Sequence, residues 1–376
     1  MRHEDGAASA LIVGAGIGGM STAIALRRIG VDVELIDIDP HWKVTGAGIT
    51  ITGPTLRAFK ALGAYDEIAA RGYVGEGIRV CDMAGEHVRD LATPMPPEAG
   101  VAGCGGITRP VLHAILSART LASGARVRLG VSVDRLEQDA GGVDVTFSDG
   151  ATGRYDVVVG ADGIASRTRG QIFPHAPRAA YTGQSVWRVF THRPPDVNRR
   201  HYFLGGPVKV GFTPVSDDRM YLFVLERTPK ERRTPDALVP DLAALLEGYG
   251  GIVKTIRESL TTASEVVFRP LEAFLLPAPW HVGRVILIGD AAHPTTPQLA
   301  SGAGIAVEDA LVLAEEIEVA ATVPDAFDAF LARREERCRL VVESSIEIGR
   351  LEQQRAPAEA QTAVVEHALR RLAEPI

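Results

Sequence analysis

The alternation of apolar and polar positions changes character along the chain. Near the N-terminus, a short apolar run at residues 11–13 and alternating apolar residues at 31, 33 and 35 flank a predicted helix at 20–29. A strand, a helix and a second strand in this order predict a βαβ unit with parallel strands. Later apolar runs at 157–159 and 285–288 have the length of buried strands. Together these segments predict a Rossmann-like α/β domain.

The pattern between residues 181 and 269 is different. Strand-like segments at 184–190, 209–212 and 220–225 follow one another without helices that could cross between parallel strands. This arrangement favours an antiparallel sheet. A segment at 235–249 has the composition of a helix, with a proline near its start.

Beyond residue 325 the apolar residues recur at helical spacing, which predicts a long C-terminal helix. We therefore expect an α/β fold in which an antiparallel-sheet domain is inserted into a Rossmann-like domain. The expected boundaries are 1–180 for the first part of the Rossmann-like domain, 181–270 for the inserted domain, 271–325 for the second part and 326–376 for the C-terminal helices.

The turn after the first strand has the glycine spacing of a dinucleotide-binding site. Gly14, Gly16 and Gly19 form the pattern G-x-G-x-x-G, in which the glycines permit a tight turn, the approach of a pyrophosphate and close helix–strand packing. Asp37 ends the second strand, where a carboxylate can bind an adenosine ribose. A glycine-rich turn without a ligand is the alternative, but the flanking strand, helix and acid favour a nucleotide. The unit by itself does not separate NAD from FAD.

Two further buried strands end in an acidic residue beside a glycine, at Asp162-Gly163 and at Gly289-Asp290. Open α/β sheets bind ligands at the carboxyl ends of their strands. We therefore expect Gly14, Asp162 and Asp290 to converge on one long ligand. The glycine-rich residues 301–304 then open an apolar helix, and the free N–H groups of a helix start favour an anionic group. The bland alternative is that Asp290 only caps a helix.

Composition narrows the class of protein. The chain has 376 residues, of which 46% are hydrophobic and 23% charged, and this length suffices for two cores. A formal charge of −7 without a dense basic run argues against nucleic acid as a partner. The three cysteines lack metal-binding spacing, and no apolar run is long enough to span a bilayer. We predict a cytoplasmic protein without a metal site or stable membrane association, either a monomer or a homodimer.

In their order along the chain, these motifs resemble those of the single-component, FAD-dependent aromatic hydroxylases (group A flavoprotein monooxygenases), such as salicylate and 4-hydroxybenzoate hydroxylases. The resemblance runs from Ala10 to about Phe330. Its motifs are the fingerprint at Gly14, Gly160-Ala161-Asp162-Gly163 with Ser166 and Arg169, and Gly289-Asp290-Ala291-Ala292-His293 with Pro297 and Gly302. This chain departs from the family at Lys43, where Arg is usual, and at Gln298-Leu299-Ala300-Ser301-Gly302, where Phe-Leu-Gly-Gln-Gly is more usual.

The resemblance implies a tightly bound FAD, with NAD(P)H and O₂ as co-substrates. NAD(P)H would reduce the flavin, O₂ would form a hydroperoxide at flavin C4a, and the distal oxygen would pass to a small phenolic or aromatic-acid substrate. A single dinucleotide fingerprint fits this family, in which NAD(P)H has no Rossmann domain of its own. The residues expected to contact FAD are Gly14, Gly16, Ile17, Gly18, Gly19, Asp37, Lys43, Gly46, Gly48, Ile49, Arg109, Val133, Asp162, Gly163, Asp290, Pro297, Gly302, Ala303 and Gly304.

The antiparallel sheet is expected to form the floor of the substrate pocket. The polar candidates on this sheet are Gln184, Arg188, His201, Tyr202 and Tyr221, and Pro297 and Gln298 are expected from the flavin side. Plainer roles remain open for three of them: Arg188 could pair with a surface carboxylate, His201 could lie on a solvated edge, and Tyr221 could be a half-buried sheet residue. We expect His293 to organise the turn after Asp290 by hydrogen bonding rather than to act as a general base.

Two other classes of function remain open. One is a different FAD-dependent oxidoreductase on the same scaffold, such as a dehydrogenase or a reductase; a halogenase is disfavoured because no W-x-W-x-I-P-like motif is present. The other is a non-catalytic flavin-binding protein. The consumption of NAD(P)H distinguishes the second class from an enzyme.

Overall fold

The computed structural model describes residues 7–44, 46–93, 95 and 99–376 of the chain. The predicted βαβ unit is confirmed: β1 (Ser9–Val13) and β2 (Asp32–Asp37) pair in parallel and are joined by α1 (Ile17–Arg28). β12 (Val157–Gly160) lies parallel to β1, and β19 (Val285–Leu287) lies parallel to β12. The strand order β18-β19-β12-β1-β2-β8 is completed by β18 (His281–Val282) and β8 (Arg126–Leu129). The three strands expected to end at one ligand are therefore neighbours in this sheet.

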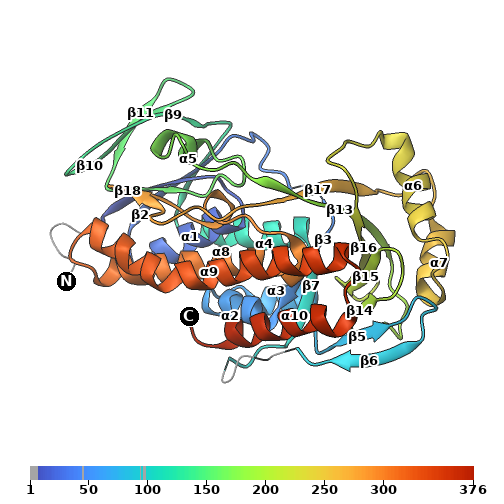
Figure 1. Cartoon of the computed structure of the whole chain (residues 1–376). Helices are drawn as coiled ribbons and strands as arrows, with labels where there is room; N and C mark the ends of the chain where they lie inside the picture. Colours follow the sequence, from blue (N-terminus) through green and yellow to red (C-terminus); the bar gives the residue numbers. More distant parts are fainter. Residues whose placement is uncertain (1–6, 45, 94, 96–98) are drawn as a thin grey trace.

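Helices and two small sheets cover the parallel sheet (Figure 1). The largest hydrophobic core packs apolar residues of β1 and β2 against several of the helices, because the strands are apolar on both faces. The helices are α2 (Gly53–Ala61), α3 (Tyr65–Arg71), α4 (Arg109–Ala122), α5 (Arg167–Ile172), α8 (Gly302–Val319), α9 (Val323–Gln353) and α10 (Ala358–Ala373). The small sheets are β3 (Gly48–Thr52), β7 (Cys104–Thr108) and β4 (Tyr73–Gly75), and β11 (Thr152–Tyr155), β10 (Gly142–Phe147) and β9 (Val133–Asp139).

A second large sheet lies beside this domain. Its strand order is β17 (Val267–Ala273), β13 (Ala180–His192), β16 (Arg219–Arg227), β15 (Lys209–Pro214), β14 (Arg200–Phe203), β5 (Ile78–Cys81) and β6 (His87–Leu91). Its pairings are antiparallel as predicted, except that β14 runs parallel to β5. The strands β5 and β6 precede residue 180, so the predicted domain 181–270 does not contain the whole sheet. The sheet is instead formed by two separate parts of the chain.

The two faces of the second sheet have different neighbours, because side chains alternate along each strand. One face packs on α6 (Leu238–Leu245) and α7 (Gly251–Ser259) through an apolar cluster that includes Trp187 and Phe212. The predicted helix over 235–249 is thus shorter and begins with a 3₁₀ turn at Pro235–Ala237. The other face carries Tyr202, Tyr221 and Phe223 and turns toward the Rossmann-like domain.

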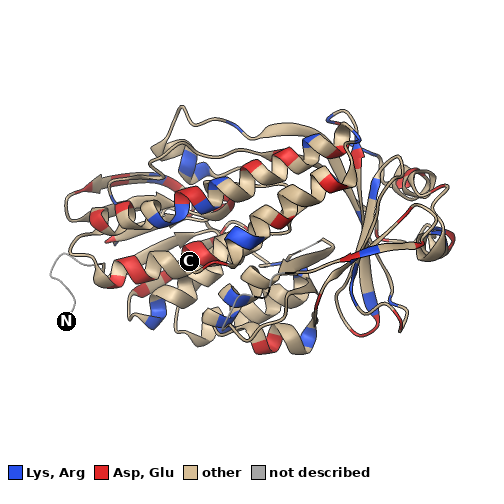
Figure 2. Ribbon diagram, turned by 60° about the horizontal axis from the view of Figure 1, so that its bottom comes forward, with Lys and Arg blue, Asp and Glu red and all other residues tan. Residues whose placement is uncertain are grey.

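The predicted long C-terminal helix is α9, which runs along the Rossmann-like domain to the second sheet (Figure 1). Figure 2 shows Lys and Arg interspersed with Asp and Glu along the long helices rather than gathered by sign. Within the described residues, none of the helices combines the length and apolar character that a membrane crossing requires.

Candidate active site

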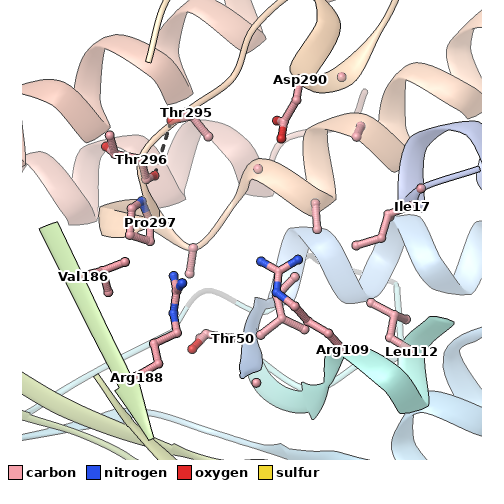
Figure 3. A pocket seen from close by; sticks show the side chains of 18 of the residues that line it. Ile17, Thr50, Arg109, Leu112, Val186, Arg188, Asp290, Thr295, Thr296 and Pro297 are labelled. Atoms are coloured by element: carbon pink, nitrogen blue, oxygen red, sulfur yellow. Dashed lines mark hydrogen bonds between the residues drawn. The ribbon is translucent and has the colours of Figure 1, made fainter. Parts of the chain in front are cut away.

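A cavity of about 420 Å³ lies between the strand ends of the parallel sheet and the inner face of the second sheet. Figure 3 shows Arg109 and Asp290 extending into it from the Rossmann-like side, while Arg188 rises from β13 toward Pro297. The predicted residues that line this cavity are Gly16, Ile17, Gly18, Gly48, Ile49, Arg109, Gly163, Arg188, Tyr221, Asp290, Pro297, Gln298, Gly302 and Ala303. One cavity thus joins predicted FAD residues and predicted substrate residues.

The fingerprint glycines have the spatial surroundings that their spacing predicts. Gly14 has a φ of +102°, and a Cβ there would lie 2.5 Å from the carbonyl oxygen of Ala161. A Cβ on Gly19 would lie 1.8 Å from the carbonyl oxygen of Gly14. By contrast, a Cβ on Gly16 would meet no atom within 4 Å. The turn is therefore tight on its protein side and open on the side that faces the cavity.

The starts of α1 and α8 offer uncapped N–H groups to the same cavity. Neither Gly16 nor Ser301, the residues before these helices, makes a side-chain capping hydrogen bond. Gly16 and Gly302 line the cavity. Unpaired N–H groups and the helix dipole favour anionic groups at both positions.

Asp290 follows β19 in the turn Gly289–Ala291, lines the cavity and is exposed to it in the absence of a ligand. Burial raises the pKa of its carboxyl group above the ordinary value, and the positive charges of His293 and Arg109 offset part of this effect. Within the described ranges its carboxylate has no hydrogen-bond partner in the protein. Asp290 therefore does not serve as a helix cap here and is available to a ligand.

A buried ionic network fixes the loop that carries Asp290. Asp309 of α8 accepts hydrogen bonds from the backbone N–H of Gly289 (2.9 Å) and from Nε2 of His293 (2.7 Å). Arg334 of α9 donates to Asp309 (2.8 Å) and to Glu308 (2.8 Å). The prediction that His293 organises this turn is confirmed. The roles of Asp309 and Arg334 were not predicted, although an acidic pair on an apolar helix is a signal that could have indicated them.

Each charged group of this network stabilises the charged form of its neighbours. Burial favours the neutral form of Asp309, but His293 and Arg334 outweigh it and hold the pKa of that carboxyl well below its usual range. Burial also disfavours a charged His293, yet Cys338 and Asp309 raise the pKa of the imidazole well above its ordinary value. His293, Asp309 and Cys338 have possible metal-ligating atoms within 4.8 Å of one another. A metal ion bound by these three residues would lie beside the positive guanidinium of Arg334, which already donates a hydrogen bond to the carboxylate of Asp309. This arrangement disfavours a metal ion there.

The loop between Pro297 and Gly302 contributes Pro297, Gln298, Ala300 and Gly302 to the cavity wall. Ala300 has a φ of +52°, in the left-handed region that glycine adopts more easily, and it stands where the family more usually has Gly. Gln298 is buried and its Nε2 donates to Oε1 of Gln184 (3.0 Å). The side-chain oxygen of Gln298 has no partner among the described residues.

The remaining predicted FAD residues lie outside the cavity wall. Asp37 accepts the N–H of Ala15 (2.7 Å) at the fingerprint turn, and Asp162 accepts the N–H and hydroxyl of Thr168 (3.0 Å each) at the start of α5. Lys43 is exposed, and a Cβ on Gly46 would lie 3.5 Å from Arg109. Gly14 and Gly19 lie beneath the turn, and Gly304 packs against Thr55.

Val133 also lies outside the cavity wall, with its side chain buried in the core between β9 and the parallel sheet, and its contact with FAD stays a prediction.

On the substrate side, the prediction for His201 is wrong. Strand alternation places His201 on the face away from the cavity, where its ring stacks on Phe212 at 4.5 Å between centroids. Burial lowers the pKa of His201 to about 4, so the imidazole is neutral at neutral pH. Its neighbours Arg200 and Tyr202 line the cavity instead. The strand β14 was not predicted, and without its register the inward residues could not be distinguished.

The last turn of α9 reaches the cavity wall at Glu352. One of its carboxylate oxygens lies 2.6 Å from Nζ of Lys209, and the other accepts from Gln184 (3.1 Å). Although burial disfavours the charged amine, Glu352 outweighs this effect and raises the pKa of Lys209. Neither Lys209 nor Glu352 was predicted as a site residue.

Known proteins share this sequence and architecture. The family described as FAD binding domain matches residues 7–347. A 2-heptyl-3-hydroxy-4(1H)-quinolone synthase from Pseudomonas aeruginosa is 33% identical over 353 residues, which cover 92% of this chain and 90% of the relative. A 3-amino-4-hydroxybenzoate 2-monooxygenase from Streptomyces cremeus is 33% identical over 313 residues, covering 80% and 76%. The structure of Klebsiella pneumoniae HpxO complexed with FAD and uric acid has a TM-score of 0.82 and 26% identity, covering 98% of this chain and 93% of HpxO.

The chain belongs to the FAD-dependent monooxygenase family.

The cavity of this family member fits an FAD. Its elongated wall runs from Gly16, with open space above the backbone, past Arg109 and Asp290 to Pro297. The uncapped starts of α1 and α8 can receive a pyrophosphate and the pyrimidine edge of a flavin, both of which carry or acquire negative charge. The carboxylate of Asp290, which lacks a protein partner, can accept hydrogen bonds from hydroxyl groups of the ribityl chain. These features are those that a bound FAD requires from the protein.

Proposed function

We propose that this chain is an NAD(P)H-consuming, FAD-dependent monooxygenase that hydroxylates a small aromatic substrate. The observation that carries the proposal is a cavity lined both by predicted FAD residues and by Arg188 and Tyr221 of the second sheet, with Arg188 extending toward Pro297 (Figure 3). Two relatives are named for a quinolone and an aminohydroxybenzoate, and HpxO was solved with uric acid, so aromatic and heteroaromatic rings recur in this family. A cytoplasmic location, and a monomer or homodimer, remain part of the proposal.

The residues of the chain would bind and orient the reactants. Bound FAD supplies the transfer of electrons from NAD(P)H and the activation of O₂. Arg109 and the start of α1 hold the pyrophosphate, Asp290 binds the ribityl chain, and the N–H groups at Gly302 and Ala303 face the flavin pyrimidine. Asp37 would bind the adenosine ribose after exchanging its present contact with Ala15.

The floor would position the aromatic ring and keep water away. Tyr221 is buried and its hydroxyl is hydrogen-bonded to Thr50, which in turn contacts Thr213 (2.9 Å). These three linked hydroxyl groups can hydrogen-bond to the hydroxyl of a phenolic substrate and orient it without the help of water. Tyr202 and Phe223 also line the cavity, where the guanidinium of Arg200 lies 4.5 Å and 5.9 Å from their ring centroids. Positioning and exclusion of water are the contributions that this reaction needs from a protein.

The test is NAD(P)H oxidation by the purified, FAD-loaded protein with a panel of phenols and aromatic acids, while hydrogen peroxide and hydroxylated product are both measured. We expect at least one compound to accelerate oxidation with product formed in preference to peroxide. Oxidation that yields only peroxide with every compound would favour an oxidase or reductase. A protein that retains FAD but consumes no NAD(P)H would favour the non-catalytic alternative.

Gln298 offers a more specific test of the pocket. Its side chain lies in the cavity wall and contacts Gln184 rather than the fingerprint region. We therefore expect Gln298→Ala to change substrate stimulation while FAD affinity stays within about twofold. Unchanged stimulation by every active compound would remove Gln298 from the site.

A further inference from the structure

The last turn of α9 is docked against the start of β13. Nε2 of Gln353 donates to the backbone carbonyl of Thr182 (3.1 Å), and a Cβ on Gly183 would lie 2.5 Å from Oε1 of Gln353. Gly183 has a φ of +85° and lies where the pairing of β13 with β17 shifts its register. Irregularities of this kind redirect neighbouring side chains. Gln184, the next residue, is buried and donates to Glu352 of α9 (3.1 Å).

The carboxylate of Glu352 receives hydrogen bonds from three elements of the fold. One oxygen lies 2.6 Å from Nζ of Lys209 in β15. The other oxygen accepts from Nε2 of Gln184 and, at 3.4 Å, from Nε2 of Gln298. Gln298 also donates to Oε1 of Gln184 (3.0 Å). The side chains of Lys209 and Glu352 are only 10% and 4% exposed, so water contributes little to this cluster.

The carboxylate also determines the direction of the two amides. A carboxylate that is paired with an ammonium group only accepts hydrogen bonds. Gln184 and Gln298 must therefore direct their NH₂ groups toward Glu352, and the oxygen of Gln184 remains available for the second hydrogen of Gln298. In the opposite orientation, the oxygen of Gln298 would face two other acceptors. Glu352 thus fixes both the place and the orientation of the Gln298 side chain.

A glycine within α9 makes room for this arrangement. Gly349 is buried and lies about one turn before Glu352. A Cβ at this position would lie 2.8 Å from Oε1 of Gln184 and 3.1 Å from Nε2 of Gln298. Glycine inside a helix is less favourable than alanine by about 1 kcal/mol. The close approach of the two amides explains its presence here, and this observation is independent of the charges in the cluster.

The cluster joins the two sides of the cavity. Gln298 lines it from the loop beside the expected flavin, and Lys209 lines it from the second sheet. In the same loop Ala300 has a φ of +52°, a conformation that alanine does not favour by itself. Leu299 packs with Ile348 of α9 in an apolar cluster. The position of this loop therefore depends on contacts of its side chains with the C-terminal helix.

We propose that Glu352 is a positioning residue of the monooxygenase, which from the end of α9 holds Gln298 beside the flavin and Lys209 in the cavity floor. This inference rests on the proposed function, because it assigns a role in that reaction. Glu352 is not among the described residues that line the cavity, so it acts through the two that do. A loop held in one place favours the transfer of electrons from NAD(P)H into product rather than into hydrogen peroxide.

Glu352→Ala removes the acceptors that hold the loop. The visible absorbance spectrum of the bound flavin is recorded for the variant and for the unaltered protein, without NAD(P)H or substrate. We expect a changed spectrum while the FAD content stays stoichiometric, because Gln298 lies beside the flavin and not at the fingerprint turn. With the compound that best stimulates NAD(P)H oxidation, the fraction of electrons that ends in peroxide should rise at least twofold.

Glu352→Gln combined with Lys209→Met separates positioning from charge. Glutamine keeps an oxygen that can accept from Gln184 and Gln298, and methionine removes an ammonium group that would otherwise be buried without a partner. The spectrum of this double variant should be closer to that of the unaltered protein than the spectrum of Glu352→Ala. The matched control is Glu347→Gln, since Glu347 is 40% exposed and pairs within α9. The control should change neither the spectrum nor the peroxide fraction.

A double-mutant cycle shows whether Glu352 acts through Gln298. If it does, Glu352→Ala should change the spectrum little further in a protein that already carries Gln298→Ala. A contribution of Glu352 to stability alone would give additive changes. Strict additivity, an unchanged spectrum and peroxide fraction in Glu352→Ala, or a charge-free double variant as altered as Glu352→Ala would overturn the proposal.

The spectra require no turnover and therefore separate this inference from the proposed function. If no compound stimulates NAD(P)H oxidation but the spectra follow the expected cycle, Glu352 positions the loop and the monooxygenase activity is refuted. If the unaltered protein forms hydroxylated product and Glu352→Ala changes neither the spectrum nor the peroxide fraction, the monooxygenase stands and the positioning role of Glu352 is refuted.

Discussion

Replacing Arg334 with methionine tests whether the flavin loop depends on the C-terminal helix. Arg334 is fully buried in α9 and donates to Asp309, to Glu308 and to the backbone carbonyl of Ile305 (3.1 Å). Methionine keeps an unbranched side chain and most of the volume of arginine but removes the guanidinium and its charge. The substitution therefore isolates the ionic contacts from the loss of packing.

The expected loss in the free energy of unfolding depends on the hydrogen-bond partners that Asp309 and Glu308 keep in the variant. Removing one partner of a buried ion pair is destabilising by about 3–5 kcal/mol. Asp309 keeps His293 and the N–H of Gly289, while Glu308 keeps two hydrogen bonds from Arg337 (2.7 and 2.9 Å). These partners place the expected loss near the lower end, at about 3 kcal/mol. For a chain of 376 residues, an unfolding entropy of about 0.8 kcal/mol/K converts this loss to a decrease of roughly 4 °C in Tm.

The assay is thermal unfolding of the apoprotein and of the FAD-loaded protein, together with the dissociation constant of FAD. Arg333→Met is the matched control, since Arg333 precedes Arg334 and pairs with the more exposed Glu315 and Glu316. Such surface pairs contribute about 0–1 kcal/mol. We expect Arg334→Met to weaken FAD binding as well, because Asp309 positions the turn that carries Asp290.

Two results would refute this reasoning. A decrease in Tm no greater than that of Arg333→Met would mean that the buried charges are compensated in another way. In a double-mutant cycle, Arg334→Met and Asp309→Asn should be less than additive, because the second change removes the charge that the first leaves unpaired. Strict additivity would show that the two residues do not act as a pair.

Three further predictions concern single residues. Asp290→Ala should weaken FAD binding by tenfold or more and Asp290→Asn by less; a protein that keeps stoichiometric FAD after extensive dialysis would count against this. Glu352→Gln should free Lys209 to bind anions, so that the affinity for salicylate rises while that for salicylamide does not; equal changes for both would contradict it. Because the pKa of His293 is raised on folding, its contribution to stability is complete below its ordinary pKa of about 6.5 and is lost as pH rises through the folded value. The difference in Tm between the unaltered protein and His293→Gln should therefore shrink from pH 6 toward alkaline pH, and a difference that grows would be incompatible with this sign.

The parts of the site that were predicted are those that backbone geometry imposes on the sequence. A glycine is needed at Gly14 because its φ is positive, and at Gly19 because the carbonyl of Gly14 occupies the space of a side chain. Asp290 was found because it comes just after a buried strand and beside Gly289. Such constraints act over a few residues, so a local pattern is enough to recognise them.

The substrate side could not be predicted in the same way, because it depends on pairings between distant segments. His201 and Arg200 are adjacent in sequence, yet the register of β14 against β15 places His201 against Phe212 on one face and Arg200 in the cavity on the other. Glu352 lies 143 residues from Lys209, with which it pairs. A one-residue change of register would exchange the inward and outward sets, and composition gives no indication of the register.

The C-terminal helix connects the two ends of the site. Arg334 secures the turn that carries Asp290, and Glu352 neutralises Lys209 at the substrate wall. The two positions are 18 residues apart, or about 27 Å along a helix that rises 1.5 Å per residue. Elsewhere on α9, the exposed Arg339 and Arg350 pair with carboxylates of the same helix. The face of α9 that carries them is therefore polar and compatible with contact with solvent. The length of α9 is therefore explained by the distance between the flavin loop and the substrate floor, and a second copy of the chain is not needed to account for it.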